Sequence, residues 1–260
     1  MQNIYLELTS AFNADRLRAI ISSGQAVVLH RLAIMSKDGD WILRENAETM
    51  QHILHVLSEH GARYRFGAPL DLRWMAGGWS SHFEFRRDQL RVRTDFVTRP
   101  ARIEPALLAE MWNGMDPQRP VVGPAALAEI KKTNREKDYA IIGELARLMS
   151  EPREQLFYSR SARDLLALAP AHPRLIEELS PQRPLLQAIA QGQTRLEEAL
   201  DAERRSLIRV NENRLAGYRV AAQRWATVWP ELEKETRDLA LPAAHELVST
   251  RALALLPFAP

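Results

Sequence analysis

Apolar and polar residues follow two different patterns along the chain, and the change between them falls near residue 150. Before it, short apolar runs rich in β-branched or aromatic residues are typical of strands. Helical spacing of apolar residues between these runs predicts intervening helices. The predicted strands occupy residues 18–22, 34–43, 62–67, 83–85, 90–97 and 121–122.

Helix boundary signals accompany the predicted helices. Asn46 suits an N-cap and Gly61 a C-cap for the amphipathic residues between them. Pro105 and Pro124 suit the first positions of two further helices. The mixture of strands and helices indicates an α/β or α+β domain over residues 1–150.

After Pro152 the strand signal disappears, and a Leu-, Ala-, Arg- and Glu-rich sequence punctuated by prolines predicts an all-helical domain over residues 151–260. The longest segment without a proline runs from about residue 185 to 229. The final residues, ALALLPFAP, are apolar, and we expect them to dock on the same protein or on a partner subunit. The apolar stripe expected along the long segment comprises Leu186, Ile189, Leu196, Leu200, Leu207 and Val210.

Composition narrows the class of protein. The formal charge of +2 is too mild to indicate nucleic-acid binding by itself. The chain has no cysteine, which excludes disulfides and thiolate metal sites. Its first residues lack the basic start and apolar run of a signal peptide, and no stretch reaches membrane-spanning length. We therefore expect a soluble cytoplasmic protein that does not associate with membranes.

The acidic pair Asp38 and Asp40 is the first candidate for chemistry. In a strand, residues two apart point to one side, and a third acid from a neighbouring strand, Asp95, would complete a set of hard oxygen donors for divalent cations. Such a set is what two-metal nucleotidyl transfer requires. Taken alone, the Asp-Gly sequence would more often mark a polar hairpin turn.

Four segments, taken in order, resemble the minimal or AbiEii-like nucleotidyltransferases of the polymerase-beta superfamily. Residues 22–31 (SSGQAVVLHR) resemble the family's glycine-containing turn and following helix, and residues 36–43 (SKDGDWIL) resemble its signature with two aspartates. VRTDFV, residues 92–97, resembles the strand with the third aspartate, and residues 121–145 are similar to its closing helices with a basic turn between them. The order and spacing of the four segments are more specific than any one of them.

The resemblance implies an α+β fold, with a nucleotidyltransferase-type mixed sheet and flanking helices, plus the C-terminal all-helical domain. It implies transfer of a nucleotidyl group from a nucleoside triphosphate to an acceptor hydroxyl with Mg²⁺ or Mn²⁺. Asp38, Asp40 and Asp95 would be the catalytic and metal-binding residues, and Asp95 would also help to deprotonate the acceptor. The residues that would bind the triphosphate are Ser22, Ser23, Gly24 and Ser36 near the turn, and Lys131, Lys132, Arg135 and Lys137 in the closing segment.

The resemblance leaves the partners open. It allows RNA, protein side chains or small molecules as acceptors, as in nucleotidyltransferase toxins of bacterial defence systems. The C-terminal helices would select the acceptor, or would bind an antitoxin-like partner or a second copy of the chain.

Three positions depart from the family pattern. Ser23 and Arg31 stand where the family has glycines, and Gly39 replaces an apolar residue between the acids. A serine is unfavourable if the backbone requires positive φ. The departures favour an alternative, a catalytically inactive member that binds nucleotide or a partner. The three aspartates oppose it. A third interpretation, an unrelated α/β hydrolase, is poorly supported because this sequence has no G-x-S-x-G or comparable nucleophile motif.

Other side chains have structural interpretations beside the functional ones. His30 suits a helix end, and the histidines at 52, 55 and 60 lack the spacing of a zinc pair. Trp74 and Trp79 flank two glycines, as in a base-stacking loop or a core-packed hairpin. Alternation places Arg91 and Arg93 on the same strand face as Asp95.

Overall fold

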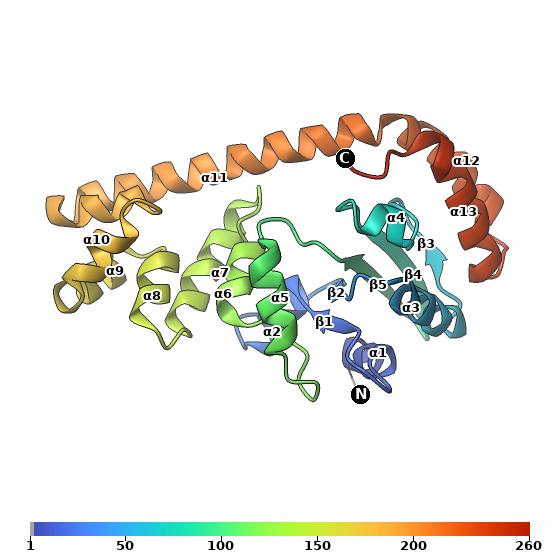
Figure 1. Cartoon of the computed structure of the whole chain (residues 1–260), viewed down its shortest axis with the longest axis horizontal. Coiled ribbons are helices and arrows are strands. Elements are labelled where there is room, and N and C mark those ends of the chain that lie inside the picture. The colour runs from blue at the N-terminus through green and yellow to red at the C-terminus, as the bar shows by residue number, and fades with distance from the viewer. Residues whose placement is uncertain (1–2) are drawn as a thin grey trace. The chain divides into compact units, whose positions relative to one another are not determined.

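The computed structural model describes residues 3–260 and contains one five-stranded mixed sheet (Figure 1). The strand order is β1-β2-β5-β4-β3. Only β2 and β5 pair in parallel, and the other neighbours are antiparallel. The strands are β1 (Ala19–Ile21), β2 (Gly39–Leu43), β3 (Arg63–Tyr64), β4 (Ser81–Arg87) and β5 (Leu90–Val97).

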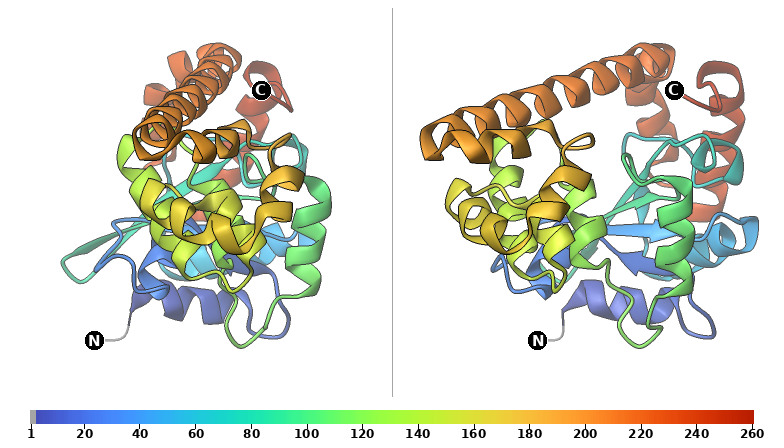
Figure 2. Two further views of the ribbon diagram at one scale, coloured as in Figure 1. Left: turned by 90° about the vertical axis from the view of Figure 1, so that its left-hand side faces the viewer. Right: turned by 60° about the vertical axis from the view of Figure 1, so that its left-hand side comes forward.

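The chain divides into two compact units, Met1–Val122 with Ala216–Pro260, and Gly123–Leu215. The first contains the sheet and the helices α1 (Ile4–Phe12), α2 (Ser23–Leu29), α3 (Ala47–Glu59), α4 (Leu72–Met75), α5 (Pro105–Asn113), α12 (Gln223–Thr236) and α13 (Leu241–Leu255). The second contains α6 (Pro124–Ile130), α7 (Glu136–Arg147), α8 (Pro152–Tyr158), α9 (Ala162–Leu168), α10 (Pro173–Leu179) and the 3₁₀ segments Ala169–Ala171 and Pro184–Gln191. The helix α11 (Gln193–Ala221) begins in the second unit and ends in the first (Figure 2).

Alternation along the strands gives the sheet one aromatic face. Trp41 lies opposite Phe96, and their rings stack at 5.4 Å between centroids. Helix α1 covers this pair, since Phe12 packs edge-on against both rings and Thr9 Oγ1 accepts a hydrogen bond from Trp41 Nε1 at 2.9 Å. The other face of the same strands carries charged residues. Packing on the aromatic face therefore fixes which residues of β2 and β5 lie opposite each other on the charged face.

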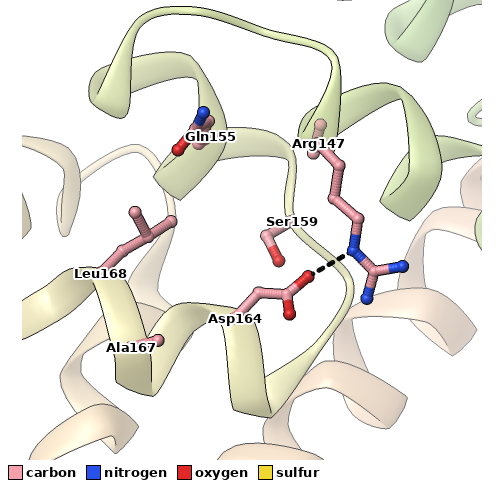
Figure 3. A pocket seen from close by; sticks show the side chains of 7 residues that line it. Arg147, Gln155, Ser159, Asp164, Ala167 and Leu168 are labelled. Carbon is pink, nitrogen blue, oxygen red and sulfur yellow. Dashed lines mark hydrogen bonds and ion pairs between the residues drawn. The ribbon is translucent and has the colours of Figure 1, made fainter.

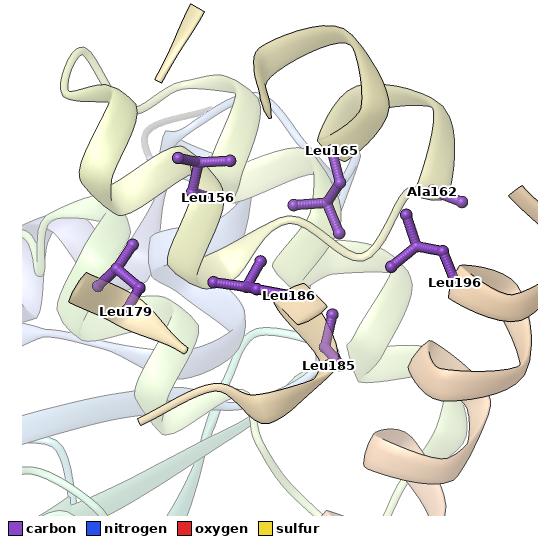
Figure 4. Close-up of a cluster of buried hydrophobic side chains, with 7 residues drawn as sticks. All are labelled: Leu156, Ala162, Leu165, Leu179, Leu185, Leu186 and Leu196. Atoms are coloured by element: carbon purple, nitrogen blue, oxygen red, sulfur yellow. The ribbon is translucent and has the colours of Figure 1, made fainter. Parts of the chain in front are cut away.

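The second unit has its own apolar core, drawn in Figure 4. Buried Arg183 adds a polar element beside this core, and donates hydrogen bonds to the carbonyls of Leu156 and Ser159 at 2.6 Å and to Glu203. This guanidinium thus joins the end of α8 to α11. The core comprises Leu156, Ala162, Leu165, Leu179, Leu185, Leu186 and Leu196.

The C-terminal tail docks on its own unit, one of the two outcomes expected for it. Trp74 Nε1 and Trp79 Nε1 donate hydrogen bonds to the carbonyls of Leu256 and Pro257 at 3.2 and 2.9 Å. A Cβ on Gly77 would lie only 1.7 Å from the Phe258 carbonyl oxygen, so glycine makes this contact possible. The two tryptophans are core-packed rather than arranged as a base-stacking platform.

The fold confirms the predicted α+β class, with a mixed sheet, flanking helices and a helical C-terminal region. The strand expected over residues 34–43 begins only at Gly39, because Ile34 and Met35 are exposed in a loop. Residues 121–122 contribute one bridge to β1 rather than a strand. The domain boundary expected at residue 150 falls inside the second unit.

The helices of the C-terminal half do not follow the proline positions at two points. Pro230 does not end a helix but lies inside α12, and Gly192, at φ 90°, separates the 3₁₀ segment from α11 within the proline-free segment. The expected stripe is only partly buried, since Leu186 and Leu196 are in the core while Val210 is half exposed. Within residues 3–260, no helix is both long enough and apolar enough to cross a bilayer.

Candidate functional site

Two of the predicted acids meet in the parallel pair at the middle of the sheet. Asp40 of β2 and Asp95 of β5 are direct register partners, so both side chains extend from the charged face. Neighbouring strands are about 4.8 Å apart, which keeps the two carboxylates close. The Asp95 side chain is 24% exposed and therefore accessible to a ligand.

Asp38 lies just before β2 and faces Arg93 of β5. The distance from Arg93 Nη1 to Asp38 Oδ1 is 3.5 Å, within ion-pair range but beyond a good hydrogen bond. Asp38 Oδ1 is itself buried and has no hydrogen-bond partner among residues 3–260. An under-satisfied carboxylate oxygen is suited to a cation, but Asp38 does not form a three-acid metal cage with Asp40 and Asp95.

The turn at the start of α2 lies against the acids. The backbone N–H of Gly24 donates to Asp40 Oδ2 at 3.4 Å. Buried Gln25 reaches the carbonyls of Ser36 and Asp38, each at 3.4 Å, and Ser36 Oγ donates to the Asp38 carbonyl at 3.1 Å. A Cβ on Gly24 would lie 2.3 Å from Ser36 Oγ, so this glycine allows the turn and the acidic loop to pack closely.

The departures from the family pattern now have physical descriptions. Ser23 has φ 46° and Arg31 has φ 62°, so both non-glycine residues occupy left-handed backbone where glycine would be unstrained. The position of Gly39 leaves no room for a side chain, because a Cβ would lie 2.4–2.6 Å from the rings of Trp41 and Tyr5. The aromatic packing therefore requires glycine between the acids.

Asp95 is held by two side chains that the sequence interpretation missed. His82 Nδ1 lies 2.8 Å and Arg65 Nη1 3.4 Å from Asp95 Oδ1. His82 Nε2 is also 2.8 Å from Ser80 Oγ, which completes a Ser80–His82–Asp95 chain of polar contacts. Alternation on β4 could have placed His82 on the charged face, but only knowledge of the strand register identifies Asp95 as its partner.

Tyr5 and Gln25 are the other site residues that sequence reasoning missed. The Tyr5 hydroxyl donates to the Lys37 carbonyl at 3.0 Å beside the acidic loop. Burial raises the pKa of Tyr5, and the charges of Asp38 and Asp40 raise it further. Tyr5 therefore stays a neutral donor that supports the loop.

The four predicted basic residues lie in the second unit. Lys131 and Arg135 contact buried Asp138, at 3.5 and 2.8 Å, and Lys132 pairs with Glu129. Burial lowers the pKa of Lys132 against the opposing effect of Glu129. Asp138 therefore stabilises the turn between α6 and α7 through its contacts with Lys131 and Arg135. Lys137 is exposed.

A pocket of about 290 Å³ lies in the second unit, and none of the predicted site residues lines it. Arg147 Nε donates to Asp164 at 2.8 Å across it (Figure 3). The ion pair holds α7 to α9, which gives these two residues a structural role within the unit. The lining residues are Ala146, Arg147, Gln155, Ser159, Asp164, Ala167 and Leu168.

The remaining histidines fit the structural interpretation. His30 caps α2, with Nε2 2.8 Å from the Val122 carbonyl oxygen. His52 Nε2 is 3.0 Å from the Ala11 carbonyl oxygen, and His60 stacks on Phe85. Throughout residues 3–260, no three His, Asp or Glu side chains are grouped closely enough to hold a metal ion by themselves.

Comparison with known proteins gives two structural similarities. Neither protein-family models nor curated proteins show a match to the sequence. One solved structure, described as a "putative nucleotidyltransferase" from H. pylori, is 10% identical, with a TM-score of 0.39 over 81% of this chain and 96% of its own. A second, JHP933 from Helicobacter pylori, is 11% identical, with a TM-score of 0.39 over 85% of this chain and 98% of its own.

Proposed function

We propose that the charged face around Asp40 and Asp95 is the active site of a metal-dependent nucleotidyltransferase, as the sequence resemblance implies. The observation that carries the proposal is the direct pairing of Asp40 with Asp95, with Asp38 on the same face and its Oδ1 lacking a hydrogen bond. Mg²⁺ in such sites is commonly bound by one or two carboxylates together with substrate phosphates. The donor set therefore suits the ion even though no three acids within residues 3–260 form a cage.

In the proposed reaction, the acceptor hydroxyl oxygen bonds to the α-phosphorus of a nucleoside triphosphate, and the bond to pyrophosphate breaks. Asp95 accepts the hydroxyl proton, while His82 and Arg65 keep its carboxylate oriented. A divalent cation held by one or two of Asp38, Asp40 and Asp95 together with phosphate oxygens would neutralise triphosphate charge. The N–H and hydroxyl of Ser23 would contact the phosphates. The N–H groups of Ser22 and Gly24 and the Ser36 hydroxyl donate to Asp40 and Asp38 in the free protein, so they would have to exchange these bonds to do the same.

The basic residues of the second unit form a separate part of the proposal. Lys137 is exposed, and we propose that it can bind a phosphate group of the nucleotide. Lys131, Lys132 and Arg135 are held by Asp138 and Glu129, which leaves them less available to a phosphate. A Lys137→Ala variant should then weaken nucleotide binding without changing the melting temperature of the free protein.

The test is thermal stability of the purified protein with each nucleoside triphosphate, with and without Mg²⁺ or Mn²⁺. A ligand that binds the native state raises the melting temperature by mass action. We expect a metal-dependent shift that the Asp38→Ala, Asp40→Ala double variant lacks and that Asp238→Asn, which alters an exposed carboxylate elsewhere, retains. Turnover is then measured as pyrophosphate release with candidate RNA, protein and small-molecule acceptors.

The outcomes distinguish an active nucleotidyltransferase from a nucleotide-binding module without catalysis. A shift with nucleotide but no pyrophosphate release from any acceptor would support a nucleotide-binding module without catalysis. An unchanged melting temperature with every combination of nucleotide and metal would contradict the proposal.

One observation favours a second candidate reaction. Ser80 Oγ, His82 and Asp95 are linked by two contacts of 2.8 Å, with Nδ1 of the imidazole toward the carboxylate and Nε2 toward the hydroxyl, as in serine hydrolases. Labelling with a fluorophosphonate probe tests it. Covalent labelling at Ser80, lost in Ser80→Ala and in His82→Gln, would favour acyl-transfer chemistry, and an unlabelled protein would exclude it.

A further inference from the structure

The sheet carries a second charged feature at its β3 edge. There a pocket of about 490 Å³ is lined by one buried carboxylate, three arginines and the end of α3. The three arginines and one glutamate together carry a net charge of two positive units (3 − 1 = 2). The lining residues are His60, Gly61, Arg63, Glu84, Phe85, Arg86 and Arg91.

Glu84 fixes two of the arginines. Its Oε1 accepts from Nε and Nη2 of Arg63, at 3.1 and 2.6 Å, and its Oε2 accepts from Nε and Nη2 of Arg91. Burial raises the pKa of Glu84, but the two arginines outweigh burial and keep this pKa below its ordinary value. Within residues 3–260, neither Nη1 group makes a hydrogen bond or ion pair, so each guanidinium keeps donors for a ligand.

The third arginine has no compensating charge. Arg86 lies directly opposite Arg91 in the β4–β5 pair, and like charges in that position destabilise a sheet. Arg86 is exposed and makes no ion pair or hydrogen bond with the described residues. An anion between Arg86 and Arg91 would turn this repulsion into two attractions.

We propose that Arg63, Arg86 and Arg91 form a binding pocket for the phosphate group of a ligand. Guanidinium groups held in fixed orientation match phosphate oxygens through paired N–H donors. The pocket volume exceeds that of phosphate alone and leaves space for further ligand atoms. The His60 ring, whose centroid lies 4.9 Å from that of Phe85, borders this space. The phosphate belongs either to a free small molecule or to a nucleic-acid backbone.

The pocket does not depend on the proposed nucleotidyl transfer. Arg91 precedes Asp95 by four residues on β5, about 13 Å along the strand. Binding is therefore measured without metal or triphosphate, and an Asp40→Asn variant should retain it. Loss of metal-dependent nucleotide binding would leave this proposal unaffected, and the reverse also holds.

The experiment is calorimetric titration of the full chain with pyrophosphate at constant ionic strength, alongside fluorescence anisotropy of a labelled oligothymidylate. We expect Arg86→Ala to weaken binding about tenfold, as expected for loss of a charge-assisted hydrogen bond. The matched control is Arg119→Ala, which removes the same charge beside β1, at the opposite edge of the sheet. Pyrophosphate binding alone would identify a free ligand, and tighter, Arg86-dependent oligonucleotide binding a backbone phosphate.

A second variant separates a shaped pocket from general attraction. Glu84→Gln adds a positive charge but releases Arg63 and Arg91 from fixed positions. A shaped pocket predicts weaker pyrophosphate binding, whereas general attraction predicts tighter binding. Equal losses in Arg86→Ala and Arg119→Ala, tighter binding by Glu84→Gln, or no saturable binding of either probe would overturn the proposal.

Discussion

Asp40 and Asp95 lie directly opposite each other in the parallel pair of strands β2 and β5. Like charges on neighbouring strands repel. Arg65 offsets the charge of Asp95, His82 Nδ1 contacts the same carboxylate, and the Gly24 N–H contacts Asp40. The free protein therefore neutralises its own acids, and a divalent cation would bind in competition with those contacts.

Replacing one acid separates stability from binding. Asp40→Asn keeps an oxygen for the Gly24 N–H and removes the repulsion with Asp95, so we expect unfolding free energy without ligand to fall by no more than about 0.5 kcal/mol. The metal-dependent stabilisation by nucleotide should disappear. Urea unfolding with and without Mg²⁺ and nucleotide measures both quantities. If Asp40→Asn keeps the full metal-dependent stabilisation by nucleotide, Asp40 is not a ligand of the metal ion.

Much of this site was predictable because alternation and register are local consequences of strand geometry. The run LRVRTDFV forms β5 over the expected residues, and Asp95 shares a face with Arg91 and Arg93, as period-two alternation requires. The segment SKDGDWIL correctly predicted that Asp40 lies in a strand, although that strand, β2, begins only after Asp38.

The missed residues are those brought to the site by pairing between distant strands. His82 meets Asp95 because β4 and β5 pair with that register, which no local pattern encodes. Tyr5 and Gln25 reach the acidic loop from separate helices. The boundary predicted near residue 150 followed the local change in residue pattern. Residues 216–260 join the first unit through contacts with residues far away in the sequence, which no local pattern encodes.

The strained turn residues predict a gain in stability. Ser23→Gly and Arg31→Gly relieve left-handed strain of about 1–2 kcal/mol, and the greater entropy of glycine in the unfolded chain offsets part of it. We expect each variant to be more stable by about 0.5 kcal/mol in urea unfolding.

The matched control is the neighbouring Ser22→Gly. Ser22 has an extended φ of −133°, so glycine relieves no strain there and should cost about 0.5–1 kcal/mol. If Ser23→Gly destabilises the protein as much as Ser22→Gly does, the strain assignment is wrong.

Gly77 predicts a specific coupling to the tail. A Cβ at Gly77 would collide with the Phe258 carbonyl, so Gly77→Ala should release the tail and its hydrogen bonds to Trp74 and Trp79. We expect a loss of about 2 kcal/mol for the two bonds. Removal of residues 257–260 should then cost much less in Gly77→Ala than in the unchanged protein.

Unfolding of the four proteins of this double-mutant cycle measures the coupling. The control is Gly217→Ala, where a Cβ meets nothing within 4 Å in α11 and should stabilise the helix by up to about 1 kcal/mol. Additive losses in the Gly77→Ala cycle would contradict docking of the tail at Gly77.

The contact between Tyr64 and His245 predicts a pH dependence. The Tyr64 hydroxyl accepts from the Leu70 N–H at 3.1 Å and lies 2.6 Å from His245 Nδ1, so the tyrosine donates its proton to a neutral imidazole. Burial lowers the pKa of His245, an effect that Asp71 opposes and Arg73 reinforces. The unfolded chain, with the ordinary histidine pKa of about 6.5, then binds a proton that the folded chain resists. The resulting stability is complete above about pH 6.5 and decreases as the pH falls below it. Unfolding free energies of the unchanged protein and of His245→Asn between pH 8 and 5 test this, because the variant should lose the part of the slope that comes from this residue. Equal slopes in the two proteins would show that the imidazole does not resist protonation in the fold.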